Sequence, residues 1–187
     1  MKLALDQIRE ELFRRIDEAN TQHELLEGFR MALLDAGVVV GYNRNVRFFR
    51  TVEVSLFYSL VVLLYSLFET RPGTVSFKTL IDSLEATHGV ECVRELRDRI
   101  ARLKPYVIKV CILRNEAIGH QSTGRPLSET HTRANLLYSD VEALLSETKS
   151  LFQDISSRYF DIGSSFRDDS HLATIAVLAA LKPKGAP

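Results

Sequence analysis

The sequence has little of what would place it in an obvious class. Its two cysteines, Cys92 and Cys111, lie in apolar helical surroundings, so we expect small core residues and no disulfide framework. Basic and acidic residues both number 24, so the chain has no global basic field to attract nucleic acid. Any contact with nucleic acid must come from a local patch.

Metal-ligand spacing is also missing. The sequence has no HExxH or CxxC pattern, and its five histidines are scattered at His23, His88, His120, His131 and His171. We therefore expect no metal and no cofactor.

Long apolar runs are limited to one. Val54–Phe68 carries no charge but covers only 15 residues between Glu53 and Glu69. A membrane span needs roughly 20 apolar residues, so the run favours a buried core helix over a membrane helix. Because Met1–Ala19 is rich in charge, it does not resemble a signal peptide. We expect a cytoplasmic protein without membrane contact.

Helical periodicity extends over nearly the whole chain. Apolar residues at three- and four-residue steps predict an amphipathic helix from Leu3 to about Ala19. Thr21–Glu24 reads as a capping box, before a second helix, or a continuation, to about Leu34. The apolar segment Ala36–Gly41 ends in glycine and predicts a break.

A long helix is predicted from about Asn45 to Thr70. Ser55, Ser59 and Ser66 fall within about 40° of one another on it, a stripe that favours close intrachain packing over a dimer seam. Turn and capping residues give the remaining boundaries. These are a turn at Arg71–Gly73, a helix from Ser76 to His88, a helix from Val90 with a kink or break near Lys104 at Pro105, a polar loop at Gln121–Leu127, a capping box at Ser139–Glu142 opening a helix to about Phe160, and a last helix capped by Asp168, Asp169 or Ser170.

The segment Arg114-Asn115-Glu116-Ala117-Ile118-Gly119-His120 carries most of the functional information. Arginine binds phosphate through a fixed, always-charged fork, and histidine transfers protons near neutral pH. The spacing alone decides nothing, because chance gives about 1.4 such matches and Arg125–His131 is a second one. Context favours the first pair, since an apolar helical run precedes Arg114 whereas Pro126 follows Arg125 in the polar loop.

Helical geometry constrains how the pair can work. Six residues leave Arg114 and His120 about 120° apart on an ideal α-helix, so they do not share a face. They can act together if the helix ends near Gly119, which would free His120 from the helical grid. Alternatively, Arg114 of one chain can meet His120 of a second chain across a two-fold axis.

Leu113 to His120 resembles the signature of the HEPN superfamily, in which an arginine and a polar residue lead to a histidine after a short spacer. Arg114, Asn115 and His120 match these positions, and the layout over Leu3–Phe160 is similar to abortive-infection AbiU-like proteins. The resemblance implies an all-α, HEPN-like bundle of about four long core helices with short accessory helices. We expect that bundle to span residues 1–160, with a C-terminal helix and loose tail over 161–187. Gly119 departs from the family pattern, which often has a larger residue there.

Active HEPN proteins are metal-independent ribonucleases that usually dimerise. The resemblance therefore implies that the protein is a homodimer that cleaves RNA to 2′,3′-cyclic phosphate ends, in phage defence or a toxin–antitoxin system with an antitoxin or regulator as partner. Arg114 would hold the scissile phosphate, His120 would act as general acid or base, and Asn115 would orient His120 or bind phosphate.

A structural interpretation of the same residues stays open. Arg114 could pair with Glu69 or another buried carboxylate, Asn115 could cap the helix end, and His120 could be a loop histidine. The protein would then be a non-catalytic helical module that binds a nucleotide, RNA or a protein partner.

A second candidate for RNA contact is the basic and aromatic segment Gly41–Arg50. Arg44, Arg47 and Arg50 share a helical stripe there, beside aromatic residues that could stack on single-stranded RNA. A solvated helix start with its aromatic residues in the core is the more ordinary interpretation.

Overall fold

The computed structural model describes residues 4–119 and 127–183, and within these the chain is helical with no strand. The all-α prediction is confirmed. The elements are α1 (Leu5–Ala32), α2 (Ala36–Arg44), α3 (Val46–Leu67), α4 (Phe77–His88), α5 (Val90–Leu113), the π-helix η1 (Arg114–Gly119), α6 (Leu127–Ala134), α7 (Tyr138–Phe160) and α8 (Ser170–Ala179).

The helices fall into two compact units. The first unit comprises Met1–Glu18 and Val61–Ser165, and the second comprises Ala19–Leu60 and Phe166–Pro187. Helices α1 and α3 each contribute to both units.

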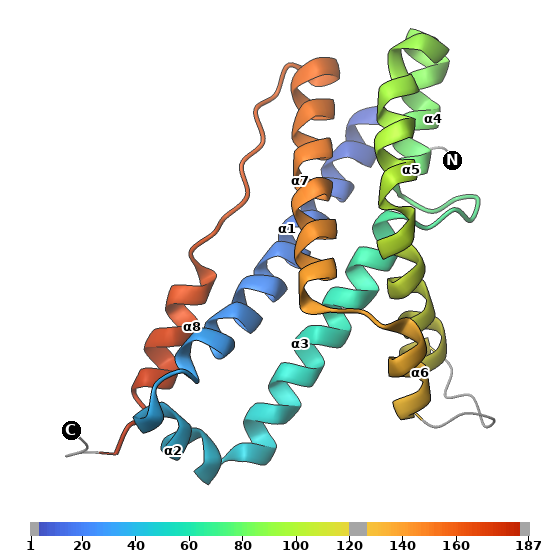
Figure 1. Cartoon of the computed structure of the whole chain (residues 1–187). Coiled ribbons are helices and arrows are strands. Elements are labelled where there is room, and N and C mark those ends of the chain that lie inside the picture. Colours follow the sequence, from blue (N-terminus) through green and yellow to red (C-terminus); the bar gives the residue numbers. More distant parts are fainter. Residues whose placement is uncertain (1–3, 120–126, 184–187) are drawn as a thin grey trace. The chain divides into compact units, whose positions relative to one another are not determined.

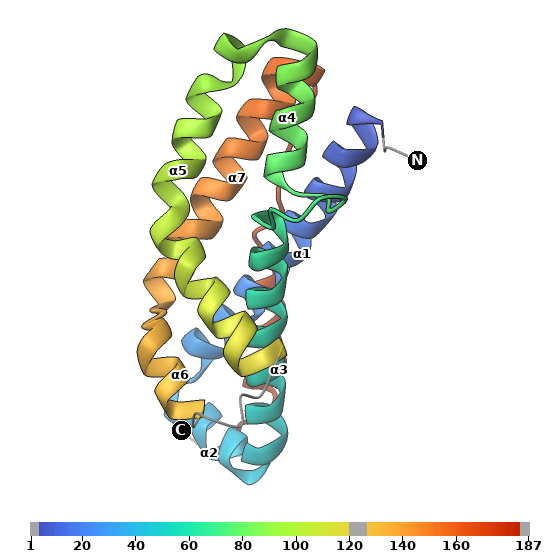
Figure 2. The ribbon, with the colours of Figure 1, turned by 90° about the vertical axis from the view of Figure 1, so that its right-hand side faces the viewer.

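The first unit is organised around α5, which packs against α4, α6 and α7 (Figure 1 and Figure 2). Large apolar side chains from these helices and from the C-terminal end of α3 fill its core, so each helix buries its apolar face. Fully or nearly fully buried examples are Leu64, Leu67, Phe77, Leu80, Leu84, Leu96, Val110, Leu113, Leu144, Phe152 and Ile155.

Helix α5 continues through Pro105 without a break and bends part-way along its length (Figure 2). Proline has no N–H to give to the carbonyl four residues earlier, so the helix loses one hydrogen bond and bends there. Of the two predicted outcomes near Lys104, the kink is confirmed and the break is wrong.

The second unit packs α8 against α2, around a cluster formed by Phe29, Ala32, Val38, Tyr42, Phe49 and Leu178. Two helical glycines allow close approach. A Cβ on Gly41 would lie 2.2 Å from the Leu181 carbonyl oxygen, and one on Gly28 would lie 2.5 Å from Thr174 Cβ. Glycine is required at both positions because any side chain would collide with the neighbouring segment.

Of the two alternatives predicted at Thr21–Glu24, the continuation of the first helix is confirmed and the separate second helix is wrong. Thr21–Glu24 lies inside the unbroken helix α1, and the Glu24 carboxylate accepts a hydrogen bond from the Ser170 N–H at 2.8 Å. The Glu24 side chain therefore caps the start of α8 and not a helix start within α1. The predicted break at Ala36–Gly41 is wrong, because the segment belongs to helix α2, which Asp35 caps by accepting from the Gly37 and Val38 N–H groups.

The boundary of α7 was predicted two residues too late. The helix starts at Tyr138, and the Asp140 carboxylate accepts from the Leu137 N–H at 2.8 Å. The Ser76 cap of α4 and its end at His88–Gly89 are confirmed. Helix α6 was not predicted at all.

Helix α3 is long and apolar enough to cross a membrane by length and composition alone, a property that core helices of soluble proteins share. Only 17% of its most apolar window is buried. The predicted buried core helix is therefore confirmed only near the C-terminal end, at Leu60, Val61, Leu64 and Leu67. Val54 and Val62 are exposed, and so are Ser55 and several residues nearer its start.

Candidate functional site

The motif arginine lies where α5 changes into a π-helix. The α-helical bonding ends at Leu113, and Arg114–Gly119 forms η1. Such wide turns are rare and occur frequently at functional sites. His120, Arg125 and most of the predicted polar loop lie outside the described residues, so the predicted helix end at Gly119 stays a prediction.

Arg114 is half-buried and held on two sides. Its guanidinium carbon lies 4.6 Å from the centroid of the Tyr65 ring, within cation–π range. Its Nη1 donates to the Asn115 side-chain oxygen at 2.9 Å. The Asn115 Nδ2 in turn donates to Cys111 Sγ at 3.3 Å, one turn earlier on the helix. Arg114 and Asn115 therefore form one connected polar group.

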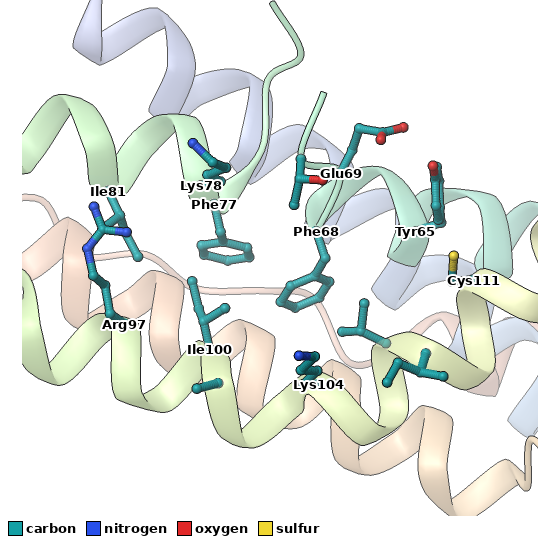
Figure 3. Close-up of a pocket in the computed structure, with 14 residues that line it drawn as sticks. Tyr65, Phe68, Glu69, Phe77, Lys78, Ile81, Arg97, Ile100, Lys104 and Cys111 are labelled. Carbon is teal, nitrogen blue, oxygen red and sulfur yellow. The ribbon is translucent and has the colours of Figure 1, made fainter. Parts of the chain in front are cut away.

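Tyr65 belongs to a second polar group, at the end of α3. A hydrogen bond joins its hydroxyl to Glu69, whose carboxylate also accepts from Arg71 at 2.8 Å. Burial, then Glu69, raises the pKa of Tyr65, whereas the Arg71 hydrogen bond lowers the pKa of Glu69. Figure 3 shows Tyr65 and Glu69 near the end of α3, with Cys111 on the adjoining stretch of α5.

The proposed pairing of Arg114 with Glu69 is wrong, because Glu69 is used by Arg71 and Tyr65. Among residues 4–119 and 127–183, Arg114 has no carboxylate partner, so its positive charge is not compensated by an ion pair. A partly desolvated guanidinium in this state favours an anion.

The acid within the motif, Glu116, is neutralised from another helix. Arg133 on α6 donates to the Glu116 carboxylate at 2.6 Å, which ties α6 to η1. This ion pair keeps a negative charge from repelling an anion beside Arg114. His131, the histidine of the other arginine–histidine pair, is an exposed residue of α6 and not part of a loop.

Sequence reasoning missed Tyr65, Cys111 and Arg133. Cys111 could have been found, since it precedes Asn115 by four residues and so shares its helical face. Tyr65 and Arg133 come from other helices, and their contacts depend on tertiary packing.

Arg44, Arg47 and Arg50 are all exposed, but the predicted common helical stripe is wrong, because Arg44 ends α2 whereas Arg47 and Arg50 lie on α3. Phe48 between them is 64% exposed, whereas Phe49 and Tyr42 are buried and stack with centroids 5.2 Å apart. Arg50 is the least available, at 3.8 Å from Glu53. Both interpretations of the segment therefore hold in part. The rings of Tyr42 and Phe49 belong to the core, whereas the ring of Phe48 is exposed beside the arginines.

Two chemical features complete the description. Within the described parts of the chain, no group of three or more histidine, cysteine or acidic side chains could hold a metal ion. Both cysteines are free, as predicted, but Cys92 is exposed, so its assignment to the core is wrong.

One family model, HEPN AbiU2, matches residues 2–176, nearly the whole chain. Comparisons with curated proteins and with solved structures gave no match. The resemblance inferred from Leu113–His120 is therefore confirmed at the level of the family, while the motif itself is not tested by that match.

Proposed function

Because the chain belongs to the HEPN AbiU2 family of abortive-infection proteins, we propose that it is a metal-independent endoribonuclease of phage defence or of a toxin–antitoxin system. One observation carries the proposal. Arg114 is oriented by Tyr65 and Asn115 at the π-helical end of α5, yet has no carboxylate partner among the described residues. This arrangement suits phosphate binding.

The proposed roles follow from side-chain chemistry. Arg114 binds the scissile phosphate and stabilises the charge that develops on it. His120 moves the proton of the ribose 2′-hydroxyl or of the leaving oxygen, because an imidazole titrates near neutral pH. Attack of the 2′-oxygen on phosphorus would expel the 5′-oxygen and leave a 2′,3′-cyclic phosphate. Asn115, hydrogen-bonded to Arg114, holds that side chain or contacts phosphate itself.

We also propose that two chains complete the site. On an α-helix Arg114 and His120 lie about 120° apart, and the π-helical turn between them does not by itself make them face each other. A two-fold axis near the motif would bring Arg114 of one chain to His120 of another. Exposed apolar residues on α3, including Val54 and Val62, are available for association.

Arg44, Arg47 and Arg50 form a secondary proposed contact with RNA. Exposed Phe48 offers a face for a base, and the arginines offer charge for phosphates. Such contacts would contribute to affinity and not to the chemical step.

The decisive experiment is an RNase assay with EDTA on the wild-type protein, Arg114→Ala and His120→Ala. We expect cleavage by the wild type and a loss of about 100-fold or more in each variant. His131→Ala is the matched control, since it removes the histidine of the other arginine–histidine pair. Its activity should match the wild type.

Full activity of Arg114→Ala or His120→Ala, with unchanged circular dichroism, would show that the roles are misassigned. RNA binding without cleavage by the wild type would establish the non-catalytic module instead. Sedimentation of the wild type with and without RNA tests the dimer.

A further inference from the structure

A cavity of about 550 Å³ lies in the first unit between α5 on one side and α4 with the end of α3 on the other (Figure 3). Its size is within the range of small-molecule sites, roughly 300–1,000 Å³. All of its lining residues belong to the first unit.

The walls of the cavity are mainly carbon. Phe68 and Phe77, whose ring centroids are 5.5 Å apart, form one side, and Ile100 on α5 faces them (Figure 3). Val107 also lines the cavity. Apolar walls offer few hydrogen-bonding groups to recognise the edge of a base or the hydroxyls of a sugar. They suit a flexible apolar chain.

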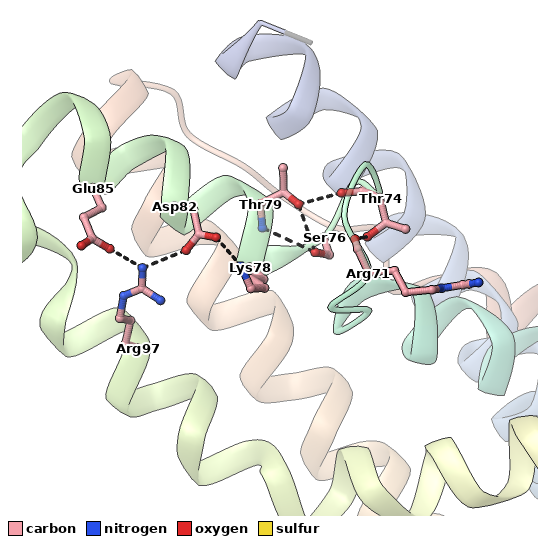
Figure 4. A network of polar contacts seen from close by, with 8 residues as sticks. All are labelled: Arg71, Thr74, Ser76, Lys78, Thr79, Asp82, Glu85 and Arg97. Atoms are coloured by element: carbon pink, nitrogen blue, oxygen red, sulfur yellow. Dashed lines mark hydrogen bonds and ion pairs between the residues drawn. The ribbon is translucent and has the colours of Figure 1, made fainter. Parts of the chain in front are cut away.

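Most of the charged side chains that line the cavity already form ion pairs. Arg97 is bound to Asp82 at 2.8 Å and also to Glu85, and Lys78 is bound to Asp82 at 2.5 Å (Figure 4). Both carboxylates lie on α4, so these ion pairs connect α4 to itself and to α5.

Lys104 is different. It is an exposed residue lining the cavity, drawn below Phe68 in Figure 3, and among the described residues it has no acidic partner. Its ammonium is therefore available to an anion at the mouth of an apolar space. A single unpaired cation among the described lining residues matches one negative charge and does not suit a polyphosphate.

We propose that this cavity binds an amphiphilic monoanion, an apolar chain that ends in a carboxylate or similar group. The chain lies along Phe68, Ile100 and Ala101, and the anionic head pairs with Lys104. Burial of the chain supplies most of the affinity, and the single ion pair selects the charge of the head.

The cavity also extends to residues that contact the motif side chains. Tyr65 and Cys111 line one end, and these residues contact Arg114 and Asn115 respectively. An occupant that moves either residue changes the position of Arg114, so binding would alter RNA cleavage. This last step rests on the proposed function, whereas binding itself does not.

Isothermal titration with decanoate, decanol and decyltrimethylammonium tests binding without RNA. We expect decanoate to bind one per chain and more tightly than the other two. Lys104→Met keeps an unbranched side chain and removes the charge, and it should weaken decanoate about tenfold while leaving decanol unchanged. Lys78→Met is the matched control, because that lysine is already paired, and it should have a much smaller effect.

Ala101→Trp fills the cavity from the α5 side and should abolish binding of both decanoate and decanol. The proposal would be overturned if decanoate at concentrations up to about 1 mM did not bind to the wild type. Equal weakening by Lys78→Met and Lys104→Met, or unchanged binding to Ala101→Trp, would also overturn it. An RNase assay with decanoate then tests the coupling, and binding without any change in cleavage overturns the coupling alone.

Discussion

The guanidinium of Arg114 lies over the ring of Tyr65, 4.6 Å from its centroid. Tyr65 comes from α3 and Arg114 from the π-helical end of α5, so the contact orients the motif arginine from outside its own helix. The Tyr65 hydroxyl is bonded to Glu69, which fixes the ring in turn.

Removing the ring should reduce activity through Arg114. We expect Tyr65→Leu to lower kcat of RNA cleavage about tenfold, equivalent to roughly 1.4 kcal/mol, because the cation–π contact is lost. Tyr65→Phe keeps the ring and loses only the hydroxyl, so most of the activity should return. Steady-state kinetics on one RNA substrate, with kcat and KM determined separately, measures both variants. Equal losses in the two variants would show that the hydroxyl matters and not the ring.

Gly41 tests the packing of the second unit. A Cβ at this position would lie 2.2 Å from the Leu181 carbonyl oxygen, so the segment after α8 must move. We expect Gly41→Ala to lower the free energy of unfolding by about 1–3 kcal/mol, measured by urea denaturation. No heavy atom of the described residues lies within 4 Å of a Cβ built on Gly163, so Gly163→Ala should change stability by less than about 0.5 kcal/mol. Wild-type stability of Gly41→Ala would mean that this approach is not kept in solution.

The boundaries of α4 were predictable because their determinants are local. Ser76 accepts from the Thr79 N–H three residues on, and Gly89 has a positive φ of 89° that favours glycine. Helix α2 was missed because its valines form a continuous run that ends in glycine, which hides the helical period, and the short-range cap at Asp35 is what distinguishes it from a break. Local patterns therefore predict an element only where one state is clearly favoured.

The residues of the site also differ in whether local sequence or tertiary packing brings them together. Arg114 and Asn115 are adjacent in sequence, so a contiguous motif identifies them, whereas Tyr65 and Arg133 reach the motif only through packing of α3 and α6. The π-helix has no evident sequence determinant, since Arg114–Gly119 reads as ordinary helix up to its glycine.

Acid should weaken the first unit through Glu11. Hydrogen bonds from Arg14 and then Arg15 lower the pKa of Glu11 from 4.5 to about 2. A carboxylate whose pKa is depressed in the folded state stabilises that state above the unfolded pKa, and the contribution is lost as pH falls from about 4.5 to about 2. Between about pH 5 and about pH 3, the urea midpoint should therefore fall more for the wild type than for Glu11→Gln. Parallel loss in both proteins would assign the acid sensitivity to other carboxylates.

Glu24 should stabilise α8 although it belongs to α1. It is buried and accepts from the Ser170 N–H at 2.8 Å, and the residue before α8, Asp169, makes no side-chain cap bond. Glu24→Ala leaves a helix-start N–H without its acceptor and should cost about 1–3 kcal/mol. Glu24→Gln keeps an oxygen in place and should cost less.

Hydrogen exchange gives the local measurement for this contact, because the amides at the start of α8 should exchange faster in Glu24→Ala. Glu18→Ala is the control from the same helix, since Glu18 forms an exposed ion pair with Arg14 at 3.3 Å and its loss should change stability by less than about 1 kcal/mol. If Glu24→Ala lowered global stability but left exchange in α8 as in the wild type, Glu24 would act through packing within α1. Faster exchange confined to the first turn of α8 would identify it as the cap of a helix 146 residues further along the chain.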